Sequence, residues 1–397
     1  MESISNRVNS LSPSATIAMN QKSRDLTAKG INVINLSVGE PDFFTPDHIK
    51  AAAKKAIDDN FSFYPPVAGF PDLKKAISEK FKRENNLDYS PEQVLVSCGA
   101  KHSLANALMS MIDKGDEVII PAPFWVSYLE LVKVCEGIPV VISAGFDNNF
   151  KITPEQLAAA ITPKTKSLLL CSPSNPTGAV YSRSELRALA DVLAKHPRII
   201  VISDEIYEHI NFIGGHETIA QFADMKDRTV VINGVSKAYA MTGWRIGYMG
   251  APLWLIKACD KLQGQTTTGA TTISQKAATA ALTGDQSCVG EMNNAFKRRK
   301  DLVVKLVREI PHLKVYDPDG AFYVFPQVNA YYGKSINGKK ISNSSDLCLY
   351  LLEEAHIATV PGDAFGDDDC IRISFATSDE KLVEAMKRMK DALVALI

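Results

Sequence analysis

The sequence lacks the marks of a secreted, membrane-spanning or nucleic-acid-binding protein. Its formal net charge is −1 and it contains no basic tract, which argues against a nucleic-acid surface. No uninterrupted apolar run approaches membrane-spanning length. Residues 1–20 are polar and include no apolar stretch of the kind found in signal peptides. We therefore expect a cytoplasmic protein that binds neither nucleic acid nor membrane.

Cysteine is sparse and irregularly placed. The seven cysteines are odd in number and show no Cys-x-x-Cys spacing, so the sequence predicts neither a disulfide framework nor a zinc site. A reducing compartment fits this usage best. No His-Glu-x-x-His motif or other metal-ligand motif occurs, and we expect no metal.

Motifs for nucleotide binding are also missing. No Gly-x-Gly-x-x-Gly opens a strand–helix unit, which argues against a Rossmann dehydrogenase. Residues 333–340 resemble a P-loop, but Lys340 stands where a Ser or Thr should bind magnesium, and no strong strand precedes it. We interpret Asn337-Gly338 as the turn of a surface hairpin.

What the sequence does contain is ample material for a core, with 46% hydrophobic residues. From Val94 onward, apolar runs alternate with helical stretches, the pattern of a mostly parallel sheet covered by helices on both faces. The link between the last two runs is too short for a helical crossover, so we expect the last strand to be antiparallel. The expected strands are 94–97, 117–120, 138–142, 167–171, 199–203, 229–232 and 244–249.

The pattern of predicted elements changes after a long charged helix expected at 290–309. Short strands are expected at 314–316, 322–325, 357–360 and 371–375, with helices at 346–355 and 379–396. The N-terminal segment, with a helix at 16–29 and a short strand at 33–36, is expected to return to this region. The sequence therefore predicts an α/β fold with a large domain of residues 46–290 and a small α+β domain of residues 1–45 and 291–397.

The rest of the chain is organised around residues 230–247. A buried strand ends at the turn Asn233-Gly234, and Lys237 follows at a strand end, where α/β sheets bind ligands. An amine flanked by the hydroxyl of Ser236 and the guanidinium of Arg245 suits a phosphorylated aldehyde. The amine would form a Schiff base, and the other two groups would bind phosphate. The alternative is a surface loop lysine.

Three further segments follow predicted strand ends. Gly99-Ala100-Lys101 opens a helix, where exposed N–H groups bind anions. Trp125 offers a flat ring on which a pyridine can stack. Asn175 lies in a loop made rigid by two prolines, with an amide that can face a phenolic oxygen. Taken singly, each also fits an ordinary turn or a core residue.

The fourth segment is Ser203-Asp204-Glu205-Ile206-Tyr207. Asp204 ends an apolar run, so its carboxylate is expected in a poorly solvated pocket, where it needs a positive partner. A protonated pyridine nitrogen provides one. Tyr207 follows three residues later and can reach the O3 atom of such a ring. A helix-capping role explains Asp204 but leaves Tyr207 unexplained.

Together these segments resemble the fold-type I pyridoxal phosphate (PLP) enzymes, and most closely the bacterial aspartate aminotransferase subgroup of the class I aminotransferases. The resemblance extends from about Leu11 to the C terminus. Its most specific parts are Ser172–Gly178, Ser203–Tyr207 and Ser236-Lys237 with Gly243–Gly247, and the bacterial subgroup is matched by Leu11–Thr16 and Gly39–Phe43. The resemblance implies an aspartate aminotransferase-like fold and PLP as the cofactor.

The resemblance also implies a role for each matched residue. The implied catalytic residues are Lys237, Asp204 and Tyr207. Lys237 would form the Schiff base and carry the proton, and Asp204 would pair with the ring nitrogen. Tyr207 would contact the ring oxygen together with Asn175. Trp125 would stack on the ring. The phosphate would be surrounded by Ala100, Lys101, Ser236 and Arg245, joined by Tyr64 from the second subunit of a homodimer with shared active sites.

The substrate would contact Gly39, Trp125 and Asn175, and Arg372 would bind its α-carboxylate bidentately. From the residues alone, Arg372 has a second interpretation. It alternates with Ile371 and Ile373, so it faces solvent if those two are the buried residues of its strand.

Lys101 is implied to bind the distal carboxylate of an acidic substrate, although this chain has Gly99-Ala100-Lys101-His102 where the family shows Gly-Gly-Lys or similar. That role favours aspartate and glutamate, with 2-oxoglutarate or oxaloacetate as amino acceptor. Aromatic amino acids, prephenate or another PLP reaction such as a β-lyase remain alternatives. A non-enzymatic PLP effector domain is disfavoured, because only residues 1–45 precede the large domain.

Overall fold

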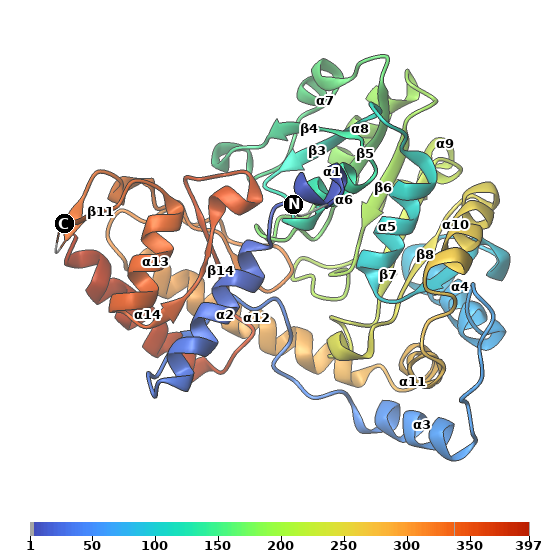
Figure 1. The fold of residues 1–397 in the computed structure, drawn as a ribbon, viewed down its shortest axis with the longest axis horizontal. Coiled ribbons are helices and arrows are strands. Elements are labelled where there is room, and N and C mark those ends of the chain that lie inside the picture. The colour runs from blue at the N-terminus through green and yellow to red at the C-terminus, as the bar shows by residue number, and fades with distance from the viewer. Residues whose placement is uncertain (1–3, 337, 397) are drawn as a thin grey trace.

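The computed structural model describes residues 4–336 and 338–396, and a seven-stranded sheet forms its centre (Figure 1). The strand order is β2-β8-β7-β6-β5-β3-β4. The strands are β2 (Val94–Ser97), β3 (Glu117–Ala122), β4 (Ile138–Ser143), β5 (Thr165–Cys171), β6 (Ile200–Asp204), β7 (Thr229–Gly234) and β8 (Gly247–Gly250). Strand β8 pairs antiparallel with β2 and β7, and the other pairs in this sheet are parallel. The mostly parallel sheet with a last antiparallel strand is thus confirmed.

The last strand is shorter than expected at its start. Residues 242–244 form a short 3-10 helix, η4 (Thr242–Trp244), and Arg245 has a left-handed backbone with φ of 56°. An extended strand cannot include that conformation. The strand therefore begins only at Gly247, and the expected start at Trp244 was wrong.

Some helices cover the sheet and connect its strands, and others lie to one side of it with the C-terminal part of the chain (Figure 1). The helices are α1 (Asn6–Asn9), α2 (Ala15–Ala28), α3 (Asp47–Asp58), α4 (Pro71–Asn85), α5 (Ala100–Met111), α6 (Ser127–Val134), α7 (Pro154–Ala160), α8 (Arg183–Ala194), α9 (Ala223–Lys226), α10 (Leu253–Thr266), α11 (Thr272–Thr283), α12 (Ser287–Arg308), α13 (Ser344–Glu354) and α14 (Asp379–Val394). Helix α8 shows why such a segment is helical. Ser182 and Glu185 form a capping box at its start, and its buried residues Leu186, Leu189 and Leu193 recur every three to four positions.

The two faces of the sheet have separate cores because successive strand residues point to opposite sides. Ile120 and Ile202 pack with helices α5, α6 and α10 in one cluster. Their neighbours Ile119 and Val201 pack with α7, α8 and α9 in another. Both faces are therefore covered, which is the condition that a parallel sheet requires.

The N-terminal and C-terminal segments share a further core. Met19 of α2 and Ile34 are buried with residues of α12, α13 and α14, and Figure 1 shows α2 beside these C-terminal elements. Small sheets complete this region: β1 (Ile34–Asn35) pairs with β12 (Ile357–Ala358), and β14 (Ile371–Ser374) lies between β13 (Val360–Pro361) and β9 (Tyr323–Val324). We keep the division into residues 46–290 and residues 1–45 with 291–397 as a proposal.

Two expected strands differ from the structure. Residues 314–316 form no strand; Lys314 makes one isolated bridge to Gln327. The expected strand 357–360 is divided between β12 and β13. In the second segment β12 pairs with β1 and β13 pairs with β14, so no continuous ladder forms.

The segment resembling a P-loop is a hairpin on either side of the expected turn. Strands β10 (Ser335–Ile336) and β11 (Lys339–Lys340) pair antiparallel, and Gly338 has φ of 78°. Asn337 lies outside the described residues. Across the ranges that the structure describes, none of the helices combines the length and apolar character needed to cross a membrane.

Candidate active site

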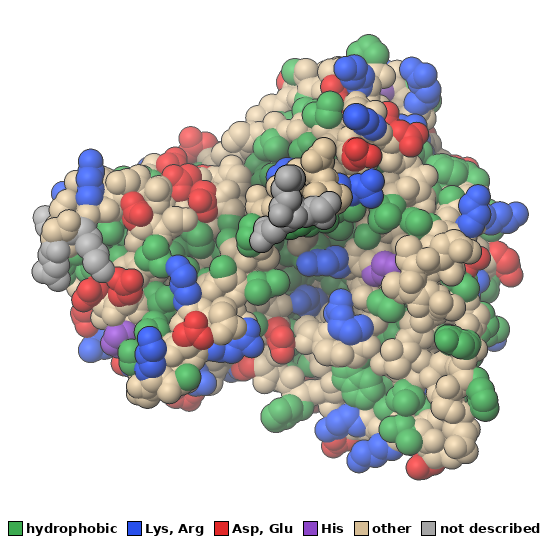
Figure 2. Space-filling model, in the orientation of Figure 1, with side chains coloured by type: hydrophobic (Ala, Val, Ile, Leu, Met, Phe, Trp, Pro, Cys, Tyr) green, Lys and Arg blue, Asp and Glu red, His purple; other side chains and the backbone are tan. Residues whose placement is uncertain are grey.

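A cavity of about 280 Å³ lies at the carboxyl ends of the central strands β5, β6 and β7. Parallel strands place their following loops at one edge of the sheet, where α/β proteins bind ligands. Every predicted site residue except Tyr64 lines this cavity. Figure 2 shows a hollow near the middle of the visible face with Lys and Arg side chains in it.

The cavity is electropositive. Among the described residues that line it, Asp204 is the one carboxylate, whereas the cations are Lys101, Lys237, Arg245 and Arg372. Such a surplus of positive charge favours an anionic ligand.

Lys237 follows β7 and is partly buried. Its Nζ donates a hydrogen bond to the carbonyl oxygen of Gly39 at 2.5 Å. Burial lowers the pKa of Lys237 to about 8, with Arg372 and Arg245 acting in the same direction and Glu40 opposing them. The amine is therefore closer to its free-base, nucleophilic form at neutral pH than an ordinary lysine.

Asp204 is the last residue of β6 and is 4% exposed. Its Oδ2 accepts a hydrogen bond from the hydroxyl of Tyr128 at 2.7 Å, and its Oδ1 accepts one from the backbone N–H of Ile206 at 3.3 Å. Burial raises the pKa of Asp204 to about 6, although both hydrogen bonds act against this rise. The sequence analysis did not identify Tyr128, whose place in a helix with apolar neighbours matched a core residue.

Tyr207 is joined to a second tyrosine that the sequence analysis also missed. The hydroxyls of Tyr207 and Tyr323 are 2.7 Å apart. A β-carbon at position 39 would lie 2.6 Å from the Tyr323 hydroxyl oxygen, so a larger residue there would displace this hydroxyl. Gly39 thus lets the N-terminal segment approach both Tyr323 and Lys237.

Arg372 is 1% exposed, so the interpretation that it faces solvent is wrong. All four residues of β14 are buried, because this strand is the middle one of three. Its Nη1 donates to Oδ1 of Asn175 at 3.0 Å, and its Nη2 donates to the carbonyl oxygen of Ser37 at 2.6 Å. Its Nε is buried and has no hydrogen-bond partner among the described residues. Because Arg372 lines the cavity, a ligand bound there could accept a hydrogen bond from this N–H.

The start of α5 forms a cradle with Arg245. Gly99 precedes the helix with φ of 88°, and a β-carbon there would lie 2.2 Å from Arg245 Nη2. A β-carbon on Gly247 would lie 2.1 Å from the backbone nitrogen of Ala100. Arg245 donates to the carbonyl oxygens of Thr242 and Cys98 at 2.9 and 3.3 Å. The close approach brings the guanidinium, the Ser236 hydroxyl and the first turn of α5 to one end of the cavity.

Lys101 and Trp125 lie together on the wall of the cavity. The Lys101 ammonium is 4.7 Å from the centre of the Trp125 ring. Burial lowers the pKa of Lys101, and the neighbouring Arg245 adds to this effect. Stacking of Trp125 on a cofactor ring stays a prediction.

Tyr64 lies apart from these residues. It is 92% exposed and does not line the cavity. Its predicted contact with phosphate needs a second subunit and stays a prediction.

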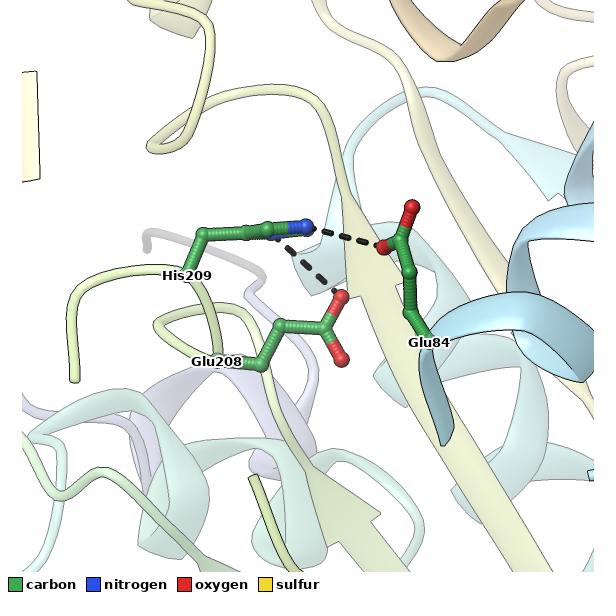
Figure 3. A group of neighbouring side chains, drawn as sticks. All are labelled: Glu84, Glu208 and His209. Atoms are coloured by element: carbon green, nitrogen blue, oxygen red, sulfur yellow. Dashed lines mark hydrogen bonds and ion pairs between the residues drawn. The ribbon is translucent and has the colours of Figure 1, made fainter. Parts of the chain in front are cut away.

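A second cluster of titratable side chains, Glu84, Glu208 and His209, lies outside the cavity (Figure 3). His209 Nε2 is 3.0 Å from Glu84 Oε2. The spacing of these groups suits a metal ion, but the fully buried ammonium of Lys80 contacts Glu208 and donates to Oδ1 of Asn85 at 2.7 Å. Lys80 supplies the positive charge that the buried carboxylates need, so we assign this cluster as an ion-pair network.

Comparison with known proteins agrees with this geometry. The model of the family "Aminotransferase class I and II" matches residues 31–389. The chain is 50% identical to a probable aspartate/prephenate aminotransferase of Rickettsia bellii, over 100% of both chains. It is 48% identical to a bifunctional aspartate aminotransferase and glutamate/aspartate-prephenate aminotransferase of Petunia hybrida, over 99% of this chain and 83% of that protein.

The solved structures agree as well. The crystal structure of the aspartate aminotransferase from Rhizobium meliloti aligns over 100% of both chains, with a TM-score of 0.97 and 46% sequence identity. The fold is therefore aspartate aminotransferase-like, as expected from the sequence. With a matching family model and full-length relatives, the chain belongs to the class I and II aminotransferases and is an aminotransferase.

Proposed function

We propose that this aminotransferase uses PLP to move an amino group between aspartate or glutamate and the matching 2-oxo acids, oxaloacetate and 2-oxoglutarate. The observation that carries the proposal is the convergence of Lys237, Asp204 and Arg372 on one electropositive cavity. These residues follow β7, end β6 and lie within β14, respectively. They supply an amine, a buried carboxylate and a guanidinium with a free N–H.

The residues present fit PLP at both of its ends. At one end, Gly99 and Gly247 allow Arg245 and the first turn of α5 to approach closely. Backbone N–H groups at a helix start, a hydroxyl and a guanidinium are the donors that phosphate requires. At the other end, the Asp204 carboxylate is buried, and its hydrogen bonds come from neutral donors. It therefore needs a cation, which a protonated ring nitrogen provides.

In this proposal each lining residue has one task toward the cofactor. Lys237 holds it covalently, and Asp204 faces the ring nitrogen. Tyr207 and Asn175 face the ring oxygen, and Trp125 covers one side of the ring. The phosphate is held by Ala100, Ser236 and Arg245, with Tyr64 of the second subunit, while Lys101 has the phosphate and a distal substrate carboxylate as its two candidate partners.

When bound, PLP supplies an electron-withdrawing ring through which an amino group is taken from one substrate and given to the next. The protein residues supply the rest. With its pKa lowered to about 8, Lys237 can give and take a proton at the substrate Cα near neutral pH. Ionised Asp204 keeps the proton on the ring nitrogen. Burial of both groups excludes water from the atoms that react.

Substrate recognition rests on two cations. Arg372 offers its unpaired Nε to the α-carboxylate, while Asn175 and the Ser37 carbonyl orient its guanidinium. None of the ion pairs found among the described residues involves Lys101, so its charge is available for a distal carboxylate. A substrate with two carboxylates satisfies both cations, which supports aspartate and glutamate.

Prephenate is a second candidate substrate, as amino acceptor. The relatives from Rickettsia bellii and Petunia hybrida are named for prephenate as well as aspartate. Prephenate also carries two carboxylates, so the same two cations would serve it.

Half-reaction spectra test the proposal. The purified protein loaded with PLP is mixed with aspartate, glutamate or phenylalanine, and the absorbance of the bound cofactor is followed. We expect aspartate and glutamate to convert the cofactor at the lowest concentrations, and prephenate to restore the original spectrum if it is an acceptor. A protein that binds no PLP, or that responds best to phenylalanine, contradicts the proposal.

A further inference from the structure

The carboxylate of Asp204 is held from two directions. Oδ1 accepts its hydrogen bond from the Ile206 backbone N–H, two residues further along the same loop, at 3.3 Å. Oδ2 accepts its hydrogen bond from the Tyr128 hydroxyl at 2.7 Å, the typical length of a strong O–H···O bond. Tyr128 belongs to α6, so it fixes the carboxylate from a separate element.

Tyr128 is itself held rigidly. It is 1% exposed, and its ring lies edge-on to Trp125 with centroids 5.5 Å apart. Its backbone N–H donates to the Trp125 carbonyl oxygen at 2.9 Å. Burial and the nearby Asp204 raise the pKa of Tyr128 well above its usual value, so the hydroxyl keeps its proton and acts as the donor.

We infer that Tyr128 is a positioning residue of the cofactor site: its hydroxyl holds the Asp204 carboxylate ionised and in the rotamer that faces the cavity. The inference rests on the proposed function, because an ionised Asp204 matters for catalysis only when a protonated ring nitrogen faces it. Tyr128 acts through Asp204 and needs no contact with the cofactor or the substrate.

Several effects act on the pKa of Asp204, and this hydrogen bond decides whether its carboxyl group is ionised at neutral pH. Burial favours the protonated acid, and the negative charge of Glu205 acts in the same direction. Tyr128 is the largest opposing influence, followed by the Ile206 N–H and the Lys237 amine. A further titratable neighbour is Cys171, which faces Asp204 across the β5–β6 pair. Even with all of these in place, the pKa of Asp204 is about 6, close to the neutral range.

Loss of the hydroxyl should therefore protonate Asp204 at neutral pH. A hydrogen bond to a charged group favours the ionised form about ten- to hundredfold. Its removal should raise the pKa of Asp204 by about one to two pH units. If Tyr128 only fills space in the core, removal of one oxygen atom leaves the pH dependence of the site unchanged.

The test compares Tyr128→Phe with wild type in two measurements. The first is the pH midpoint of the titration of Asp204 in the apoprotein, followed by carbon-13 NMR of its carboxyl group, and the second is the dissociation constant of the apoprotein for PLP as a function of pH. We expect the midpoint to rise by about one to two units in the variant. We expect PLP affinity to fall about tenfold or more below the new midpoint and to recover above it.

The matched control is Tyr350→Phe. Tyr350 is also buried, and its hydroxyl donates to the Ala392 carbonyl oxygen at 2.8 Å, between α13 and α14 and not in the lining of the cavity. This variant loses a comparable hydrogen bond, and we expect it to keep the wild-type midpoint and PLP affinity. A shift as large as that of Tyr128→Phe would assign the effect to general loss of stability and overturn the inference.

A second variant covers the case in which Tyr128→Phe does not fold. Site-specific 3-fluorotyrosine at position 128 keeps the ring and the hydroxyl but makes the hydroxyl a stronger donor, so the midpoint should move to lower pH. Wild-type midpoints in Tyr128→Phe, or in the fluorinated protein, overturn the inference alone. A wild-type protein that binds no PLP overturns the proposed function, and the inference with it.

Discussion

The guanidinium of Arg372 donates a hydrogen bond to the side-chain oxygen of Asn175 at 3.0 Å, although 197 positions separate the two residues. Because the amide oxygen is occupied by this bond, the amide nitrogen of Asn175 is left to donate elsewhere. Arg372 would then bind the substrate carboxylate, and the Asn175 N–H would donate to the phenolic oxygen of the cofactor. The hydrogen bond between Arg372 and Asn175 would connect these two contacts. Asn175, which orients the guanidinium of Arg372, is thus also the residue proposed to contact the cofactor ring.

Arg372→Lys should impair substrate binding more than cofactor binding. A lysine keeps the positive charge but cannot donate to Asn175, Ser37 and a carboxylate in one plane. Loss of one charge-assisted hydrogen bond should lower kcat/KM for aspartate about ten- to hundredfold, with most of the change in KM. The control is Arg298→Lys, an exposed arginine paired with Asp379, which should retain wild-type kinetics. Equal kinetics in the two variants would contradict the role of Arg372.

Lys237→Ala should abolish transamination and the absorbance of covalently bound PLP while the fold remains intact. The reason is that this variant removes the amine that follows β7 and keeps the sheet and its cores. Circular dichroism checks the fold, and cofactor spectra with single-turnover assays check the function. Lys50→Ala, at an exposed i,i+3 ion pair with Asp47, serves as the control. Near wild-type turnover in Lys237→Ala would contradict the proposed function as a whole.

The site residues that were predicted from the sequence share one property: a pattern of neighbouring residues in the chain indicates each of them. Asp204 and Lys237 each follow an apolar run, so the position of the strand end predicts the position of the side chain. Tyr128 and Tyr323 carry no such signal, because a tyrosine within a helix or strand pattern matches a core residue. Their partners, Asp204 and Tyr207, are far away in the chain and meet them only in the folded protein.

The same limit explains the orientation of Arg372 and the buried Lys80. Alternation along a strand predicts which residues share a face, but not that both faces of β14 are covered. A lysine in a helix is expected at the protein surface, whereas Lys80 of α4 is completely buried because it forms an ion pair with Glu208. Both outcomes depend on tertiary contacts that no local pattern contains.

Asp204→Asn should stabilise the apoprotein and inactivate the enzyme. The pKa of Asp204 rises from 3.8 to about 6 on folding, so the folded state binds more protons between these values and stability falls as pH rises through that window. The ionised Asp204 therefore lowers the free energy of unfolding by about 3 kcal/mol, and this cost is fully present above about pH 6. Asparagine carries no charge and therefore avoids this cost, but its single side-chain oxygen can accept only the Tyr128 hydrogen bond, so the loss of the Ile206 hydrogen bond offsets part of the gain.

Denaturant unfolding of the apoprotein at several pH values measures that gain, which should be absent below about pH 4. The same variant should lower the transamination rate by about a thousandfold or more, because the ring nitrogen loses its charged partner. Wild-type catalysis in Asp204→Asn would show that Asp204 is only a structural residue at the end of β6.

The loop Phe61–Pro66 should form part of a homodimer interface. Phe63 and Tyr64 are 83% and 92% exposed, and exposed aromatic residues of this kind are typical of interface cores. Phe63→Glu should shift the protein toward monomers in light scattering and weaken PLP binding, since Tyr64 would no longer reach the other subunit. Val383→Glu, at an exposed position on α14, should leave both measurements unchanged. A fully active wild-type monomer at assay concentration would contradict this prediction.

Lys101 decides between two interpretations of substrate range. Its ammonium lies over Trp125 within the cavity and near the start of α5, where the helix dipole disfavours a cation unless an anion is close. Both the cofactor phosphate and a distal substrate carboxylate are candidate anions. Burial lowers the pKa of Lys101, so its charge is costly in the empty site and an anionic ligand gains more from neutralising it.

The two anions are separated by comparing substrates in Lys101→Ala. If Lys101 binds the distal carboxylate, aspartate loses a charge-assisted hydrogen bond of about 1.5–3 kcal/mol, a factor of about ten to a hundred in kcat/KM. Phenylalanine has no distal carboxylate, so its kcat/KM should change little. If Lys101 serves the phosphate alone, both substrates lose activity equally and the affinity of the apoprotein for PLP falls. Because Ala100 and the α5 N–H groups remain in place, PLP affinity close to wild type together with a selective loss of aspartate activity would assign Lys101 to the substrate.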